Sequence, residues 1–179
     1  MNLWDSKNKF KNKYRIPSAR AEWHDYNDGC FFITFCTKKR MPYLGRITCK
    51  KMHYTIIGKY AHECVDKIME LHPDVTVPSW QIMPDHIHLL VIVRKSEHAN
   101  TVPEIYQNNP VSHADIAKHC GRLSHIIGQY KTAVVRYAKK HGLPLAWQER
   151  FYDRIIHNES EYANVKAYIE NNVRSWKST

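Results

Sequence analysis

Two histidines, His86 and His88, stand two positions apart in a segment that is otherwise apolar as far as Val93. Residues at this spacing point to the same side of a strand, so both imidazoles can bind one divalent cation. The ordinary alternative is a pair of core or surface histidines held by hydrogen bonds. The apolar surroundings weaken that alternative, because burying two imidazoles without partners costs desolvation free energy.

Two imidazoles do not complete the coordination of a hard cation, which also prefers oxygen ligands. Tyr168 and Asn172 are four residues apart in the last helical pattern of the chain, which places them on one face, one turn apart. The Asn172 amide could join the imidazoles, and the Tyr168 phenol could reach a substrate held by the metal. A core aromatic and a helix cap are the competing roles for these two residues.

The charge balance indicates a polyanionic partner. The 179 residues include 27 Lys and Arg against 17 Asp and Glu, a formal net charge of +10. A domain this basic is typical of proteins that bind nucleic acid.

The five cysteines form no CxxC pair, which favours reduced thiols and a cytoplasmic location. No apolar run is long enough for a bilayer, so we expect no membrane association.

The elements that must position these residues alternate in type. Residues 1–22 read as a basic N-terminal arm and 23–179 as a single domain. The pattern predicts the strands Cys30–Thr37, Val75–Met83, His86–Arg94 and Ala146–His157 and the helices Lys51–Leu71, Leu123–Lys140 and Ser160–Asn172, with a long polar loop over 95–113.

This order predicts an α+β fold of the ferredoxin-like split β-α-β type, which RNA-recognition modules share. Its antiparallel sheet would carry helices on one face. The continuous apolar character of His86–Arg94 indicates a central strand buried on both faces.

The motifs together resemble a known family. Pro84-Asp-His-Ile-His-Leu-Leu-Val91 followed by Tyr168-Ile-x-x-Asn172 is similar to the single-tyrosine HUH transposases, and more narrowly to those associated with repetitive extragenic palindromes (REP). Supporting segments are Gly29–Thr37, Ile127–Lys131 and Trp147–Glu159. The resemblance covers roughly residues 15–176. The family usually has Pro where Val173 stands, which leaves the end of the last helix open.

The resemblance implies a role for each matching residue. His86 and His88 would be the HUH metal ligands on a central strand, and Asn172 the amide ligand, with Mg²⁺ or Mn²⁺ as the ion. Tyr168, on the C-terminal helix, would attack a phosphodiester of single-stranded or hairpin DNA, leaving a 5′-phosphotyrosine and a free 3′-OH. The expected partner is palindromic repeat DNA. Monomers and homodimers both occur among such enzymes, so a homodimer stays open.

Basic residues near these motifs are candidates for contacts with the DNA backbone, although each alone is more often a solvated surface charge. They are Lys38, Lys39, Arg40, Arg122, Lys131, Arg136, Lys139, Lys140, Arg150 and Arg154. Trp147 is expected to pack in the core. Tyr130 is an alternative nucleophile, because its helix also carries basic residues.

Two rival functions remain open. A host-adopted nucleic-acid-binding module would keep the fold without strand transfer. A metal-dependent hydrolase would use the same histidines with water as nucleophile, and would stay active after Tyr168→Phe.

Overall fold

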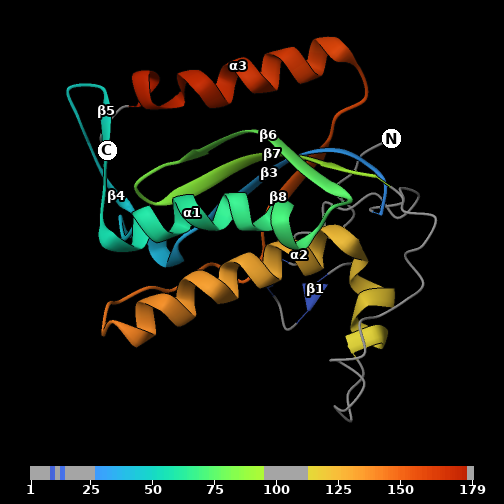
Figure 1. Ribbon diagram of the computed structural model, residues 1–179, viewed down its shortest axis with the longest axis horizontal. Helices are drawn as coiled ribbons and strands as arrows, with labels where there is room; N and C mark the ends of the chain where they lie inside the picture. The colour runs from blue at the N-terminus through green and yellow to red at the C-terminus, as the bar shows by residue number, and fades with distance from the viewer. Residues whose placement is uncertain (1–8, 11–12, 15–26, 95–112, 177–179) are drawn as a thin grey trace.

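A four-stranded antiparallel sheet forms the centre of the protein (Figure 1). The computed structural model describes residues 9–10, 13–14, 27–94 and 113–176. The sheet contains β3 (Gly29–Cys36), β6 (Val75–Ile82), β7 (His86–Val93) and β8 (Tyr152–Ile155) in the order β6-β7-β3-β8. This is the ferredoxin-like order, so the predicted α+β class and the central position of the histidine strand are confirmed.

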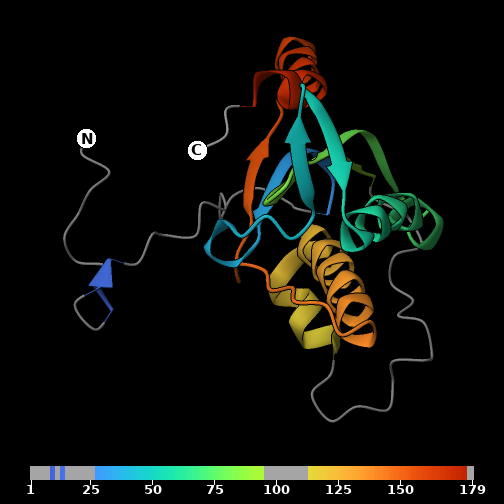
Figure 2. The ribbon, with the colours of Figure 1, turned by 90° about the vertical axis from the view of Figure 1, so that its left-hand side faces the viewer.

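Helices cover both faces of this sheet. Figures 1 and 2 show α1 (Ile56–Leu71) and α2 (His113–Lys140) on one face and α3 (Glu159–Ser175) on the other. Along β3, Phe31, Ile33 and Phe35 belong to the core with α1 and α2, whereas Cys30 and Phe32 pack in the core with α3. The prediction of helices on one face is right for α1 and α2 and wrong for α3. A strand as apolar as β7 requires a cover on both sides.

A small hairpin precedes α1 where the sequence predicted helix. It consists of β4 (Gly45–Thr48) and β5 (Lys51–Tyr54), so the helix predicted from Lys51 begins at Ile56 instead. Exposure alternates along β5 with the period of a strand, and Thr55 accepts a hydrogen bond from the Gly58 amide as the N-cap of α1. The N-cap therefore marks the start of α1, which the spacing of the apolar residues alone had placed too early.

The C-terminal elements also differ from their predicted bounds. The long helix α2 contains a break at Gly121, whose φ of 65° and ψ of 159° are not helical. The strand predicted over Ala146–His157 narrows to β8, and residues 146–148 contact the end of β3 through single backbone hydrogen bonds. Asn158 caps α3, which runs on to Ser175.

Three further elements are short. The turn η1 (Lys38–Arg40) follows β3, and β1 (Lys9–Phe10) pairs with β2 (Lys13–Tyr14). Apart from these two strands the predicted arm lies outside the described residues, as does the predicted loop up to residue 112. None of the described helices is long and apolar enough to cross a membrane.

Candidate active site

The two histidines of β7 lie side by side under α3. His86 and His88 are on the same side of the strand as Leu90, which belongs to the core beneath α3. Both side chains are buried, and their Nε2 atoms are 3.0 Å apart. The two imidazoles therefore point toward each other, as predicted from their spacing.

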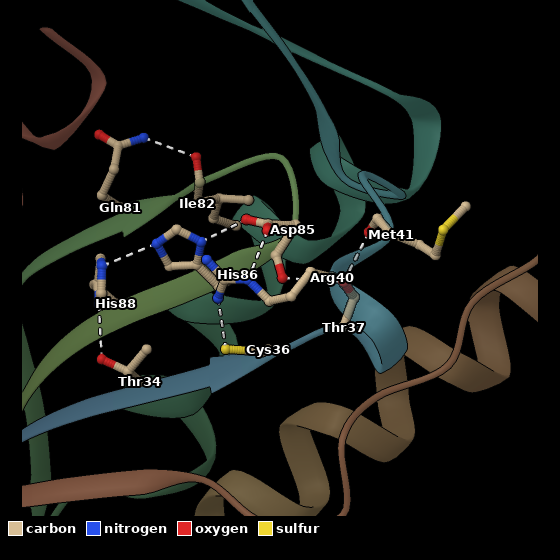
Figure 3. Close-up of polar contacts among 10 residues, drawn as sticks. All are labelled: Thr34, Cys36, Thr37, Arg40, Met41, Gln81, Ile82, Asp85, His86 and His88. Carbon is tan, nitrogen blue, oxygen red and sulfur yellow. Dashed lines mark hydrogen bonds and ion pairs between the residues drawn. The ribbon is translucent and has the colours of Figure 1, made fainter. Parts of the chain in front are cut away.

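Hydrogen bonds hold the second nitrogen of each ring (Figure 3). Asp85 Oδ1 lies 2.6 Å from His86 Nδ1, and Thr34 Oγ1 lies 2.8 Å from His88 Nδ1. A carboxylate only accepts, so Nδ1 of His86 carries a proton, and in the neutral form of the ring Nε2 presents a lone pair. A hydroxyl can donate or accept, so Thr34 allows His88 to present Nε2 either as a donor to His86 or as a lone pair.

Asp85 is itself held in place by the turn after β3. Arg40 Nε lies 2.8 Å from Asp85 Oδ2, and Arg40 Nη1 donates to Cys36 Sγ at 2.9 Å. The amide and hydroxyl of Thr37 both donate to the Asp85 carbonyl. Lys39 and Arg40 have positive φ, which is uncommon outside glycine. This tight turn brings the Arg40 guanidinium to the histidine pair.

The environment keeps His88 neutral. Burial lowers its pKa to about 3, and the positive charges of a protonated His86 and of Arg40 act in the same direction. A neutral imidazole is the form that binds metal ions.

The spacing of the Nε2 atoms fits a single cation. Two ligands at about 2.1 Å from an octahedral ion, at a right angle to each other, lie about 3.0 Å apart. The described residues contain no group of three or more His, Cys, Asp or Glu side chains that could hold a metal. Within the described part of the chain, an amide is a further ligand type that could join the two imidazoles.

Two aromatic rings, one on α3 and one at its C-cap, pack against the pair. The Tyr168 ring packs edge-on against His88 with centroids 5.3 Å apart, and the Trp176 ring lies 5.7 Å from His86. Asn172 stands between them in sequence and is 6% exposed. Tyr168 is 52% exposed, so its phenol borders the histidine pair and also meets solvent.

Tyr130 is excluded as a nucleophile by its position. It lies in the core on the opposite face of the sheet, where its hydroxyl donates to the Ala61 carbonyl at 2.6 Å. Complete burial raises its pKa well above that of a free phenol. The prediction that Tyr130 is an alternative nucleophile is therefore wrong.

The predicted DNA-contacting cations separate into two groups. Arg122, Lys131, Arg136, Lys139 and Lys140 lie on α2, across the sheet from the histidine pair. Within this group Arg122 forms an ion pair with Asp74 at 2.6 Å, and Lys131 donates to the carbonyls of Gln148 and Glu149.

The second group lies around β3 and β8. Lys38 and Lys39 are exposed on η1 beside Arg40, Arg150 is exposed before β8, and Arg154 on β8 pairs with Glu161 at 3.6 Å. Trp147 packs against Phe35 and donates to the Lys131 carbonyl, as expected for a core residue.

Three site residues were not found from the sequence. Thr34 faces His88 through the register of β3 with β7, and Trp176 reaches His86 only because α3 runs beyond Asn172. Asp85 carried a signal, since an acidic residue directly before a metal-binding histidine is well placed to bind its Nδ1.

Comparison with known proteins supports the fold. No protein-family model matches the chain. An uncharacterized protein of Haemophilus influenzae is 26% identical over 163 residues, which cover 89% of each chain. The solved structure of a REP-associated tyrosine transposase bound to a REP hairpin superposes with a TM-score of 0.51 at 17% identity, over 89% of this chain and 76% of that one. The family resemblance drawn from the motifs is thus confirmed at the level of the fold.

Proposed function

We propose that the protein is a metal-dependent DNA strand transferase of the single-tyrosine HUH transposase type. His86, His88 and Asn172 would hold Mg²⁺ or Mn²⁺, and Tyr168 would be the nucleophile. The observation that carries the proposal is the packing of a half-exposed phenol against one member of the convergent imidazole pair. The shared fold with a tyrosine transposase bound to a REP hairpin favours hairpin DNA as substrate.

The chemistry balances within one transesterification. Tyr168 Oη attacks a backbone phosphorus, the bond from phosphorus to the 3′ oxygen breaks, and the phenolic proton is transferred to that oxygen. The products are a 5′-phosphotyrosine and a free 3′-OH, so the bond energy is conserved for rejoining. A bound divalent cation would polarise the phosphate oxygens and offset the developing negative charge.

The chain's own residues would prepare this step. Asp85 and Thr34 hold the imidazoles in orientation, and Phe32 contacts both the His88 ring and the Tyr168 ring. The Trp176 ring packs against the His86 ring. A phenol ordinarily ionises near pH 10, so a cation and Arg40 close to the phosphate would favour attack at neutral pH.

Covalent trapping tests the proposal. The protein is incubated with labelled single-stranded DNA containing hairpins from the flanks of its own gene, with Mg²⁺ or Mn²⁺, and run on a denaturing gel. We expect a DNA-linked protein band that is lost with EDTA and with Tyr168→Phe. Tyr137→Phe is the control, because Tyr137 is also a helical tyrosine but lies on α2, across the sheet from the pair, where it stacks on Tyr60.

The other outcomes identify the rivals. Cleavage that persists in Tyr168→Phe without a covalent band indicates a hydrolase with a water nucleophile. Specific binding of hairpin DNA without cleavage or a covalent band indicates a binding module that has lost strand transfer.

A further inference from the structure

The β4–β5 hairpin carries its charges on one face. Arg46 pairs with His53 and Thr48 with Lys51 across the two strands, so these four side chains lie on the same side and all are exposed. The other face carries the half-buried Ile47, Met52 and Tyr54. Lys50 stands at the turn. The hairpin is therefore apolar toward the protein and cationic toward solvent.

The cations of this hairpin have no acidic partners among the described residues. Arg46, Lys50 and Lys51 form no ion pair there, whereas Arg40, Arg122 and Arg154 each bind a carboxylate. The sequence from Gly29 to His62 contains neither Asp nor Glu. Concentrated like charge is unfavourable on a small surface, and an external polyanion removes that cost.

The hairpin is anchored beside the histidine pair. The amide of Leu44, just before β4, donates to the Pro84 carbonyl at 3.0 Å, two residues before His86. At the end of β5, Tyr54 Oη accepts from Gln81 at 3.5 Å, and Gln81 faces His88 in the sheet register. Figure 2 shows the hairpin rising from the sheet toward α3, with which β5 is in contact.

We propose that residues 45–54 form a DNA-binding arm, whose cationic face contacts the phosphates of the single strand that reaches the histidine pair. This inference rests on the proposed function and extends it to a surface outside the catalytic pair. Contacts of this kind position a strand and supply affinity without reading its sequence. Arg46, Lys50 and Lys51 are the residues assigned to this role.

The turn of the hairpin offers a variant that removes charge without harming the fold. Cys49 and Lys50 both have positive φ, at 50° and 57°, as in the tight turns that usually contain Asn-Gly. Glycine is favoured at such a φ, so Lys50→Gly deletes a cation while relieving the backbone. A loss of binding in this variant therefore reports charge.

The experiment measures binding of a fluorescein-labelled DNA hairpin with a single-stranded tail by anisotropy, over a range of KCl concentrations. For Lys50→Gly/Lys51→Ala, losing two phosphate contacts should make the negative slope of log K against log salt shallower by about 1.4 and weaken binding about 10- to 30-fold near 0.1 M salt. Lys59→Ala/Lys67→Ala on α1 removes the same charge from exposed positions across the sheet from α3. This control should change binding less than threefold.

Each other result overturns the inference. One such result is an unchanged slope in the hairpin variant while wild-type protein still binds DNA and forms the covalent band. This result contradicts the DNA-binding arm and leaves the proposed function intact. Equal losses in both double variants show that only overall charge matters. A wild-type protein that binds no DNA overturns the proposed function and the arm together.

Discussion

The Asp85 side chain has one partner for each of its oxygens, the imidazole of His86 and the guanidinium of Arg40. It is 7% exposed, so an unpaired charge there would be costly, and Arg40 supplies the balancing charge. The carboxylate in turn fixes which nitrogen of His86 carries the proton. A single residue thus connects the basic turn η1 to the histidine pair.

Asp85→Asn should lower the affinity for Mn²⁺ about 10- to 100-fold, because a neutral amide holds the His86 ring less firmly and makes it a weaker ligand. Isothermal titration calorimetry of the purified protein measures this directly. Asp74→Asn is the control, since Asp74 also pairs with an arginine, Arg122, but lies away from His86 and His88. Equal Mn²⁺ affinity in Asp85→Asn and wild type would contradict the positioning role.

Among the site residues, the sequence predicted those that lie close together along the chain. The spacing of His86 and His88 in a strand, and of Tyr168 and Asn172 in a helix, follows from backbone geometry alone. The contact of Thr34 with His88 depends on how two distant strands align, and that register cannot be read from either strand.

Among the elements, α2 is interrupted at Gly121, whose φ and ψ lie in a region open almost only to glycine. Gly121→Ala should therefore destabilise the protein by about 1–3 kcal/mol. Gly128 is an exposed helical position in the same α2, where an added Cβ meets nothing within 4 Å.

Gly128→Ala should instead stabilise the fold by about 0.5–1 kcal/mol, because alanine favours helix. Urea unfolding of the two variants measures both effects. Stabilisation by Gly121→Ala, as by Gly128→Ala, would contradict the non-helical break at Gly121.

The sequence predicted the long elements better than the short ones. β7 is confirmed to within a residue, because its apolar run is bounded by Pro84-Asp85 and by Arg94. The β4–β5 hairpin was missed because Met52 and the apolar residues of α1 together continue a helical spacing. Its turn contains Cys49-Lys50 and no glycine, so the usual signal of a hairpin was absent.

Across the whole molecule, two buried histidines link stability to pH. Burial lowers the pKa of His72, and the pKa of His88 is lowered to about 3, whereas both approach 6.5 when unfolded. Below about pH 6.5 the unfolded chain therefore binds more protons than the folded one. The free energy of unfolding should fall as the pH drops from 6.5 toward the folded pKa values.

Chemical unfolding between pH 7.5 and 5 in EDTA measures this slope. His72→Gln should reduce it, because a glutamine does not titrate. His72 contacts Gln129 and Arg122, with Asp74 and His125 nearby, so the absolute stability of the variant is compared at pH 7.5 first. An unaltered slope in His72→Gln would exclude His72 as the titrating group.

The position of α3 has a consequence for the growing chain on the ribosome. The strand with both imidazoles is synthesised well before the helix that brings Tyr168 to them. Until α3 docks, Leu90 and Phe32 have no cover from it, and the histidines have no phenol beside them. A nascent chain that stops before Glu159 could hold a cation at its two imidazoles, yet it could not become covalently attached to DNA through Tyr168.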